Sequence, residues 1–411
     1  MRILIVAPGS RGDVEPYLAL GTGLVQAGNA VSILTTRDHE ARVVAAGFGL
    51  FSVDLDVQAA LQKRDVSGSL EAGGFFSSFR QLKLLAERGA QLTAEAGLRA
   101  GAETDLVVTG FGGAFMAEGI ARKFGVPLVQ AYNVPLTPTA AFAGPLLPRL
   151  DFGPRSRKLG HLLTRAAVWM TARGSGNRAR MQVLGAPSAP MFVSSATPGL
   201  VPGRVIYGYS PAFLPVGPEW GADVEVTGFW FGAADETPNP ALEAFLAAGE
   251  PPVCIGFGSM SQTNPKATTA LVLEAVRQSG LRAVLLAGWG GLTASDLPAN
   301  VLALPQASHA SLYPRCAAVV HHGGAGTTAA ALRAGVPALV VPSHGDQDFW
   351  ARRVHAAGTG PAPIPRRRLT VKALAAGLRE AEAFRSKAAA LGAVIRSENG
   401  VGRAVAAILR K

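Results

Sequence analysis

Short apolar runs alternate with amphipathic stretches along most of this chain. The first apolar run covers residues 2–7, the loop PGSRGD interrupts it, and a helical pattern then continues to Gly28. Residues 30–36 form the next apolar run. A buried parallel strand has a continuous apolar sequence, whereas a helix that covers a sheet is apolar on one face. The pattern therefore predicts strand–loop–helix units, with Gly28 ending the first helix.

The same alternation occurs twice, with a different kind of sequence between the two parts. Further strands are predicted at residues 104–110 and 126–132, and strands and helices alternate again after Pro251. Residues 190–232, in contrast, are rich in proline, glycine and aromatic residues. Repeated strand–helix alternation is typical of a parallel sheet with helices on both faces.

We therefore predict an α/β protein of two Rossmann-like, doubly wound parallel-sheet domains. The expected boundaries are an N-terminal domain at residues 1–210, a linker at 211–232 and a C-terminal domain at 233–411. A ligand is expected in a cleft between the domains, where the carboxyl ends of the strands face it. The last helical stretch, residues 401–411, can pack on either domain.

Composition favours a globular cytoplasmic protein. Of the 411 residues 48% are hydrophobic and 16% are charged, so most of the chain can pack. No run of about 18 apolar residues predicts a membrane span, and the first apolar run is too short for a signal peptide. Cys254 and Cys316 lie in apolar strand-like stretches, where buried reduced thiols are expected.

The net charge of +11 suits nucleic acid, an anionic membrane surface or phosphorylated substrates. Part of this charge is clustered in five residues, Arg149, Arg155, Arg157, Lys158 and Arg165. The chain has neither an RNA-binding signature nor zinc-finger spacing, so we expect no nucleic acid partner. Two interpretations of the cluster remain open: a solvated basic face, or peripheral contact with a membrane.

The segment HHGGAGTT carries the clearest chemical signal. A strand is predicted at residues 317–320, His321 and His322 follow it, and a helix is expected to start near Thr327 or Thr328. Glycines allow a ligand to approach the backbone, and a helix N-terminus offers unpaired amides at its positive end. These features favour an anion site, most naturally one for a diphosphate.

Other interpretations of this segment are weaker. It lacks the Gly-Lys-Ser/Thr of a Walker loop, and neither domain has the dinucleotide-binding fingerprint. Two histidines could indicate zinc, but adjacent strand residues point to opposite faces and no third ligand is nearby, so no metal is predicted. A glycine turn beside one packed histidine remains the structural alternative.

Polar residues follow two neighbouring predicted strands. After the strand at residues 338–341 come Asp346 and Gln347, whose carboxylate and amide can bind the vicinal hydroxyls of a sugar. In IGFGSM, a second glycine turn after a strand, Ser259 could reach the same phosphates.

These residues together resemble a known family. HHGGAGTT, followed by GVP, a strand and GDQ, resembles the donor-binding segment of GT-B glycosyltransferases, in the branch that holds the glycopeptide-antibiotic and sterol glycosyltransferases. The opening GSRGDVEPYLALGTGL, TGFWF and PRRRLT are similar to the same branch. The resemblance implies transfer of a sugar, with inversion, from a UDP- or TDP-sugar co-substrate to a hydroxyl, without a metal or other cofactor.

The resemblance also implies roles for individual residues. Asp13 is the expected catalytic base, although it could instead cap the following helix. His321 is the expected catalytic partner of the leaving diphosphate. The residues expected around that diphosphate are Ser259, His321, Gly323, Gly324, Gly326, Thr327 and Arg11, the last of which could also be a solvated loop residue. Asp346 and Gln347 are expected to bind the donor sugar.

The nucleotide base has two weaker candidates, Trp289 and Gln306. Related plant enzymes have a tryptophan ahead of a Pro-Gln pair, whereas Ala303 and Leu304 stand there in this chain. Asp54 and Asp56 imitate the metal-binding D-x-D of another glycosyltransferase fold, and we interpret them as a strand end.

The acceptor is expected to be hydrophobic. Two aromatic, apolar stretches, GGFFSSFRQLKLLAER and NVPLTPTAAFAGPLLPRLDF, suit an apolar aglycone such as a lipid, sterol, carotenoid or polyketide, although ordinary packing explains them too. Three competing functions are an oxidoreductase, a sugar-nucleotide epimerase and an inactive nucleotide-sugar or lipid-binding partner protein. The missing fingerprint disfavours the first, and the intact set Asp13, His321, Asp346 and Gln347 disfavours the last.

Overall fold

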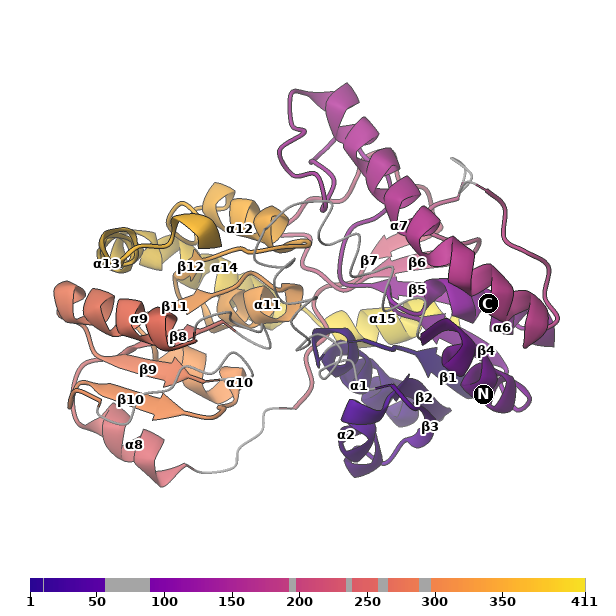
Figure 1. Cartoon of the computed structure of the whole chain (residues 1–411), viewed down its shortest axis with the longest axis horizontal. Helices are drawn as coiled ribbons and strands as arrows, with labels where there is room; N and C mark the ends of the chain where they lie inside the picture. The colour runs from indigo at the N-terminus through magenta and orange to yellow at the C-terminus, as the bar shows by residue number, and fades with distance from the viewer. Residues whose placement is uncertain are drawn as a thin grey trace. The chain divides into compact units, whose positions relative to one another are not determined.

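A computed structural model gives the fold of two compact units (Figure 1). The structure describes residues 1–9, 11–55, 89–191, 197–233, 239–257, 265–287 and 297–410, without the side chain of Arg11. Among these residues, unit 1 comprises the chain up to Gly232 together with the last stretch from Glu398, and unit 2 comprises the residues between Ala233 and Ser397.

Unit 1 contains a parallel sheet in the order β3-β2-β1-β4-β5-β6-β7. Its strands are β1 (Arg2–Val6), β2 (Ala30–Thr36), β3 (Gly49–Val53), β4 (Leu106–Thr109), β5 (Leu128–Tyr132), β6 (Arg204–Tyr207) and β7 (Val224–Val226). β1 pairs with both β2 and β4, so the direction of winding reverses between β1 and β4. Loops diverge at such a reversal and leave space for functional groups.

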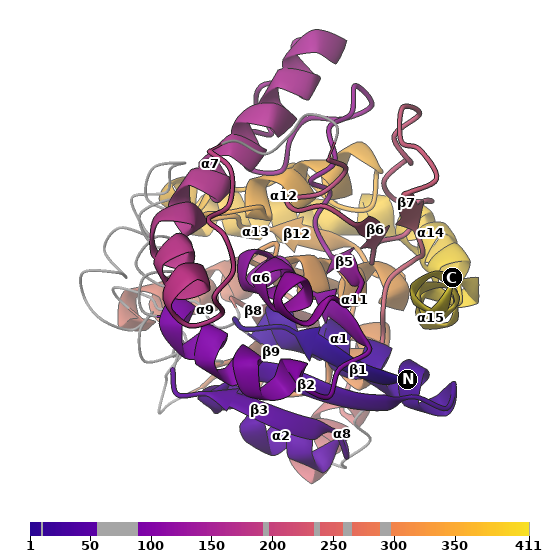
Figure 2. The same ribbon diagram turned by 90° about the vertical axis from the view of Figure 1, so that its right-hand side faces the viewer.

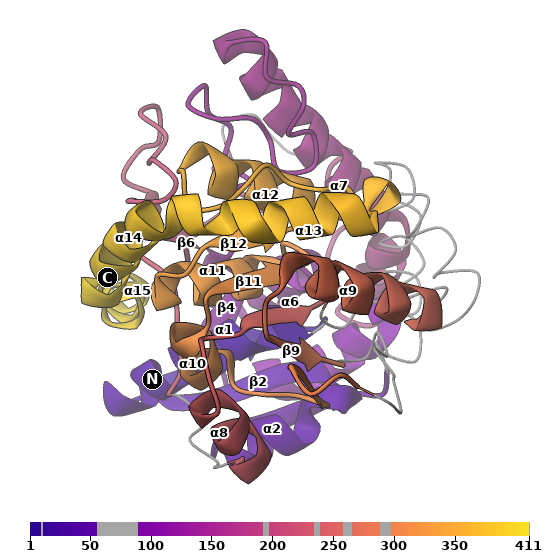
Figure 3. The same ribbon diagram turned by 90° about the vertical axis from the view of Figure 1, so that its left-hand side faces the viewer.

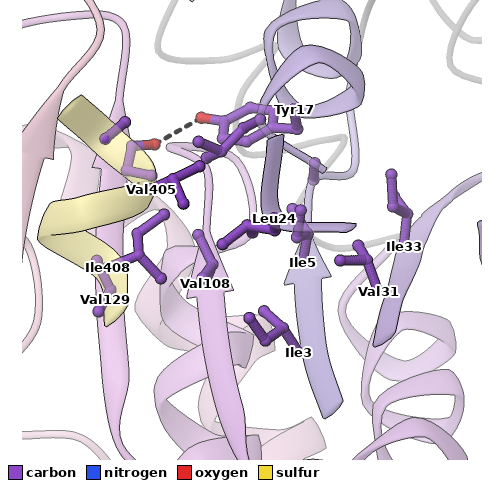
Figure 4. Packing of buried hydrophobic residues seen from close by; sticks show 14 of the residues in the cluster. Ile3, Ile5, Tyr17, Leu24, Val31, Ile33, Val108, Val129, Val405 and Ile408 are labelled. Atoms are coloured by element: carbon purple, nitrogen blue, oxygen red, sulfur yellow. Dashed lines mark hydrogen bonds between the residues drawn. The ribbon is translucent and has the colours of Figure 1, made fainter. Parts of the chain in front are cut away.

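Helices cover this sheet and include the last one of the chain. They are α1 (Arg11–Gln26), α2 (Glu40–Ala45), α6 (Ala114–Phe124), α7 (Pro154–Gln182) and α15 (Gly400–Leu409). Figure 4 shows Val405 and Ile408 of α15 directed into the core beside Val129. A side chain at Gly23 of α1 would meet Val401 Cγ1 at 2.6 Å, so glycine permits the close approach of α1 and α15.

Residues 211–232 do not form the linker that the sequence predicts. This segment lies within unit 1, where β7 pairs in parallel with β6. Trp230 is buried in the core and lies edge-on to Tyr17, with ring centroids 6.0 Å apart. The proline and glycine residues make tight turns, but the aromatic residues between them bury too much apolar surface for a solvated linker.

The basic cluster expected on one face is smaller than predicted. Arg165 is only 2% exposed and donates to the backbone oxygen of Thr197. Arg157 pairs with Asp151, and Lys158 pairs with Glu219.

Unit 2 has a second parallel sheet, in the order β10-β9-β8-β11-β12. Its strands are β8 (Val253–Gly256), β9 (Ala283–Leu286), β10 (Val301–Leu304), β11 (Ala318–His321) and β12 (Ala338–Val340). Its helices are α8 (Pro240–Ala247), α9 (Pro265–Ser279), α10 (His309–Leu312), α11 (Ala325–Ala334), α12 (Gln347–Ala356), α13 (Val371–Glu380) and α14 (Arg385–Ser397). The winding reverses between β8 and β11.

The core of unit 2 lies between the sheet and the pair α9 and α13 (Figure 3). Val272 of α9 and Leu374 of α13 pack there against Ile255 of β8. Cys254 and Cys316 are both free and buried, as the sequence predicts. The two parallel sheets confirm the predicted doubly wound α/β class. Among the described helices, none has the length and apolar character needed to cross a membrane.

The packing of α15 in unit 1 predicts a specific stability loss. Ile408 is 3% exposed in the unit 1 core, so Ile408→Ala should lower the free energy of unfolding by about 2–4 kcal/mol, because it removes apolar contacts and leaves a cavity. Denaturant unfolding of the whole chain measures this loss. Val394→Ala, at a half-exposed position on α14, is the control and should cost less than about 0.5 kcal/mol. Equal effects of the two changes would contradict the packing of α15.

Candidate active site

The HHGG segment lies at the winding reversal of unit 2. His321 is the last residue of β11 and pairs in register with Gly256, the last residue of β8. The carboxyl ends of these two neighbouring strands therefore meet where ligands bind in open α/β sheets. α11 begins at Ala325, two residues before the predicted start, so Gly326 and Thr327 lie inside its first turn.

His321 is fully buried, and one hydrogen bond fixes its tautomer. The amide of Gly323 donates to Nδ1 of His321 at 3.0 Å, so Nδ1 carries no proton. Burial, and then the nearby His322 and His309, lower the pKa of His321 to about 3. The ring is therefore neutral at pH 7 and carries its proton on Nε2. Nε2 has no hydrogen-bond partner among the residues that the structure describes.

Further buried polar atoms near His321 lack a protein partner within the described part of the chain. They are Nδ1 of His322, Oγ1 of Thr328 and Nδ1 of His344. Burial, and then the neighbouring His344 and His309, lower the pKa of His322 to about 4, and burial lowers the pKa of His344 to about 4. A buried polar atom without a partner costs roughly 1–3 kcal/mol. Several such atoms around one strand end indicate a site for a polar ligand.

Thr328 was missed by the sequence analysis, which selected Thr327. Thr328 is 1% exposed, whereas Thr327 is half-buried. The paired threonines signal a polar helix start, but which hydroxyl turns inward depends on where α11 begins. Successive side chains of a helix differ in direction by about 100°, so only one of two adjacent threonines in the first turn can face the protein interior.

The three glycines of the segment have different surroundings. Gly323 has φ +93°, and a side chain there would meet Val340 Cγ1 at 2.8 Å and the backbone oxygen of Gln347 at 3.0 Å. The amide of Gly323 also donates to His321, so this residue shapes the turn, and its role as a diphosphate ligand stays a prediction. A side chain at Gly324 would meet the ring of His322, whereas one at Gly326 would meet no atom within 4 Å.

Asp346 and Gln347 lie in the loop between β12 and α12. Oδ2 of Asp346 accepts a hydrogen bond from Nε1 of Trp350 at 2.8 Å. Oε1 of Gln347 accepts from the backbone amides of Ser343 at 2.9 Å and His344 at 3.3 Å. β12 pairs with β11, so both residues follow the strand next to His321. Gln347 therefore braces the loop that carries His344.

Asp13 lies at the winding reversal of unit 1. It is the third residue of α1 and lies inside the first turn, rather than at the position just before the helix. Its carboxylate folds over Gly9, where a side chain would meet Oδ2 of Asp13 at 2.6 Å and where φ is +151°. Burial, followed by the negative charge of Asp13, raises the pKa of Tyr17 one turn further along α1.

A buried network that the sequence analysis missed holds the backbone beneath Asp13. The backbone oxygen of Gly9 accepts a hydrogen bond from Nε2 of His39 at 3.1 Å. His39 is 2% exposed and lies 3.6 Å from Oδ2 of Asp38, whose Oδ1 accepts from the hydroxyl of Thr36 at 2.5 Å. Thr36 ends β2, the neighbour of β1, and Asp38 and His39 follow it, so the pairing of the two strands brings them to Gly9.

The remaining predicted residues lie either at exposed positions or outside the described residues. Gln306 is exposed after the edge strand β10. Ser259 and Trp289 lie outside the described residues, as does the side chain of Arg11. Asp54 pairs with Arg37 at 2.8 Å, and Asp56 lies outside the described ranges. Within the described part, no group of three or more His, Cys, Asp or Glu residues could hold a metal ion.

Two family models match this chain. Residues 3–118 match the glycosyltransferase family 28 N-terminal domain, and residues 286–400 match the erythromycin biosynthesis protein CIII-like C-terminal domain. The first match contains Asp13, and the second contains His321 and the β12–α12 loop. The fold and the site therefore define a glycosyltransferase with two Rossmann-like units, which confirms the predicted class of enzyme.

Whole-chain comparisons identify the family. Sterol 3-beta-glucosyltransferase UGT80B1 of Arabidopsis thaliana is 34% identical over 100% of this chain and 68% of its own length. A sterol 3-beta-glucosyltransferase of Cryptococcus neoformans is 33% identical over 100% of this chain but only 27% of its own length. The solved structure of glycosyltransferase VinC in complex with dTDP has a TM-score of 0.69, with 21% identity over 100% of this chain and 99% of that one. The chain belongs to the glycosyltransferase family that contains the sterol 3-beta-glucosyltransferases.

The open surroundings of Gly326 predict a separation of stability from donor binding. Gly326→Ala should fold with unchanged or slightly higher stability, because the methyl group meets no protein atom and alanine favours a helix. It should weaken binding of a nucleoside diphosphate at least about tenfold if the ligand approaches this backbone. Calorimetric titration and thermal unfolding measure the two effects.

Gly174→Ala is the matched control, because Gly174 is an exposed helical glycine of α7 with no atom within 4 Å of the added carbon. It should share the stability effect without loss of nucleotide affinity. Unchanged affinity in Gly326→Ala would remove this turn from the donor site.

The lowered pKa of His321 predicts a loss of stability in acid. The unfolded chain binds a proton at this histidine below its ordinary pKa of about 6.5, whereas the folded chain does so only near pH 3. Stability should therefore fall as the pH decreases from 6.5 toward 3, by about 1 kcal/mol at pH 5.5 from this residue alone. Denaturant unfolding of wild type and His321→Asn at pH 7.5 and 5.5 measures it. The same acid sensitivity in both proteins would show that His321 is not responsible.

Proposed function

We propose that this enzyme transfers a sugar, with inversion at the anomeric carbon, from a UDP- or TDP-sugar to a hydroxyl of a hydrophobic small molecule. The observation that carries the proposal is the buried Nε2 of His321 beside the start of α11, a neutral donor that has no partner among the described residues. Such a group suits an oxyanion on the departing diphosphate. Family membership supports sugar transfer as the reaction.

Unit 2 supplies the donor site in this proposal. As the sugar–phosphate bond breaks, negative charge develops on the diphosphate, and donors already fixed in place stabilise it without reorganising. The proposed donors are Nε2–H of His321, the first-turn amides of α11 near Gly324 and Gly326, and the hydroxyl of Thr327 or Thr328. These neutral donors and the dipole of α11 replace a metal in the proposal.

Asp346 and Gln347 are proposed to orient the donor sugar. The hydrogen bond from Trp350 fixes the carboxylate of Asp346, and the two backbone amides fix the side chain of Gln347. Prearranged groups lose little freedom when they bind a ligand. Ser259 and Arg11 are further proposed diphosphate ligands, and Trp289 and Gln306 are proposed contacts of the nucleotide base.

Unit 1 supplies the base in this proposal. An aspartate with an ordinary pKa of about 4 is a weak base toward an alcohol, so Asp13 must accept the proton as the new glycosidic bond forms. Its carboxylate lies at the N-terminus of α1, where the helix dipole favours negative charge. The buried network of His39, Asp38 and Thr36 supports the Gly9 backbone against which this carboxylate rests.

The acceptor is proposed to be a sterol-like or polyketide-like alcohol. Sterol transfer is the named activity of the plant and fungal relatives. In unit 1, the aromatic stretch at residues 133–152 is attached to β6, because the hydroxyl of Tyr207 accepts the backbone amides of Leu136 at 3.0 Å and Thr137 at 2.7 Å. Phe142 of this stretch is buried against Trp220, with ring centroids 6.1 Å apart.

We further propose that unit 1 makes peripheral contact with anionic membranes, where a lipophilic acceptor concentrates. The basic residues that remain exposed near the start of α7 include Arg149 and Arg155. Positive charge near a membrane surface is attracted to anionic headgroups within about 10 Å.

The base assignment predicts a loss of transfer without a loss of donor binding. Asp13→Asn should reduce kcat at least about 100-fold, because the amide cannot accept the proton, and it should leave UDP or TDP affinity within about twofold. Acceptor-dependent release of UDP or TDP, measured with a panel of apolar alcohols, gives the rate. Calorimetry gives the affinity.

Glu15→Gln is the control, because Glu15 lies two residues after Asp13 on α1 and pairs with Arg42 of α2. It should retain transfer. Full turnover by Asp13→Asn would remove Asp13 from the mechanism. Nucleotide release without any acceptor would support an epimerase, and tight nucleotide binding without transfer to any alcohol would support a binding protein.

A further inference from the structure

Helix α7 exposes a continuous apolar ridge. Its large exposed apolar side chains between residues 159 and 170 are Leu159 (49% exposed), Leu162 (43%), Leu163 (45%) and Met170 (55%). Leu162, Leu163 and Met170 follow Leu159 by three, four and eleven residues, which places all four along one side of the helix. Phe152, two residues before α7 begins, is 86% exposed. Single exposed apolar residues are common, but a row of them on one helix indicates a binding surface.

The side of α7 opposite the ridge is buried in unit 1, where Thr164 and Val168 lie. The flank beside the ridge is fixed as well. Trp169 is buried and packs on Phe115 of α6 with ring centroids 5.0 Å apart. Arg180 is 2% exposed, donates to the backbone oxygen of Phe115 at 3.2 Å and pairs with Glu118. In Figures 1 and 2, the first turns of α7 extend beyond the strands of the unit 1 sheet. The ridge therefore belongs to a firmly packed helix whose outer side stays exposed.

The charge along this helix has a single sign. The 29 residues of α7 contain no aspartate or glutamate, and Arg155, Lys158 and Arg178 are exposed beside the ridge. The nearby acids Asp151 and Glu219 pair with Arg157 and Lys158. An apolar row flanked by positive charge is complementary to an anionic lipid surface, which offers acyl chains below and phosphates above.

We propose that α7 is a membrane-docking helix that lies in the headgroup region of an anionic bilayer, with Phe152, Leu159, Leu163 and Met170 inserted. This inference deepens the proposed function, because it rests on the proposed lipophilic acceptor for its role and names the surface that meets the lipid. α7 directly follows residues 133–152, the aromatic stretch proposed for acceptor binding. Docking there would bring an acceptor from the bilayer to unit 1.

A second copy of the chain is a poorer occupant of the ridge. A two-fold interface brings the same patch of both subunits together. Pairing α7 with its own copy would bring together two helices that carry arginine and lysine but no acid. A lipid surface carries the opposite charge.

Vesicle binding tests the inference directly. The full chain is mixed with vesicles of phosphatidylcholine alone, or of phosphatidylcholine and phosphatidylglycerol, and bound protein is separated by flotation. Wild type should bind the anionic vesicles, less so at high salt. Leu159→Ser, Leu163→Ser and Met170→Ser combined should weaken binding at least about tenfold, because the apolar contacts with the acyl chains are lost. Val25→Ser with Val44→Ser, exposed apolar positions elsewhere in unit 1, is the matched control and should bind as wild type.

A spectroscopic reading identifies the inserted residue. Phe152→Trp introduces an indole at the exposed position, and its fluorescence should shift to shorter wavelength with anionic vesicles. The rate at which the triple variant transfers sugar to a water-soluble acceptor reports whether its fold is intact. This rate should equal that of the wild type.

The outcomes separate the two proposals. The docking helix would be contradicted if the wild type did not bind anionic vesicles. It would also be contradicted if the triple variant were active and bound them as tightly as the wild type. A wild-type dimer that the triple variant converts to monomer would replace it with a subunit interface. Vesicle binding through α7 in a protein that transfers no sugar to any acceptor would uphold the docking helix and contradict the proposed function.

Discussion

The hydrogen bond from the amide of Gly323 to Nδ1 of His321 is the interaction on which the proposed donor site depends. It leaves the imidazole proton on Nε2, and burial keeps the ring neutral at physiological pH. The ring therefore offers a fixed neutral donor and no competing positive charge. The positive φ of Gly323 makes this hydrogen bond possible, because the backbone turns back toward the ring only with a residue that lacks a side chain there.

Parallel strand order determines where these groups meet. In both units the central strand pairs with the second strand on one side and with a later strand on the other, so each sheet has one winding reversal. Asp13 follows β1 at the first reversal, and His321 ends β11 at the second. The proposed mechanism thus divides the chemistry between two similar sheets. One sheet carries the group that removes the proton, and the other carries the groups that stabilise the leaving diphosphate.

The sequence predicted those parts of the structure that depend on local pattern. Continuous apolar runs predicted the central strands, and the histidine–glycine segment predicted the turn between β11 and α11. The predicted linker failed because the aromatic residues around Trp230 pack into unit 1, a contact that chain periodicity does not encode. Long-range packing also buries Arg165, buries Thr328 in place of Thr327, and brings His39 into hydrogen-bond contact with Gly9. Each of these depends on which strands and helices become neighbours, so no local signal could have found them.

The imidazole of His321 provides the most direct test of this account. A long-range ¹H–¹⁵N spectrum of the full chain, with His321 assigned by substitution, reports which ring nitrogen carries the proton. At pH 7 the account predicts an unprotonated Nδ1, a proton on Nε2, and a marked change of the Nε2 signals when UDP or TDP is added. A proton on Nδ1 would contradict this account. So would Nε2 signals that stay unchanged when a nucleotide that is shown to bind is added.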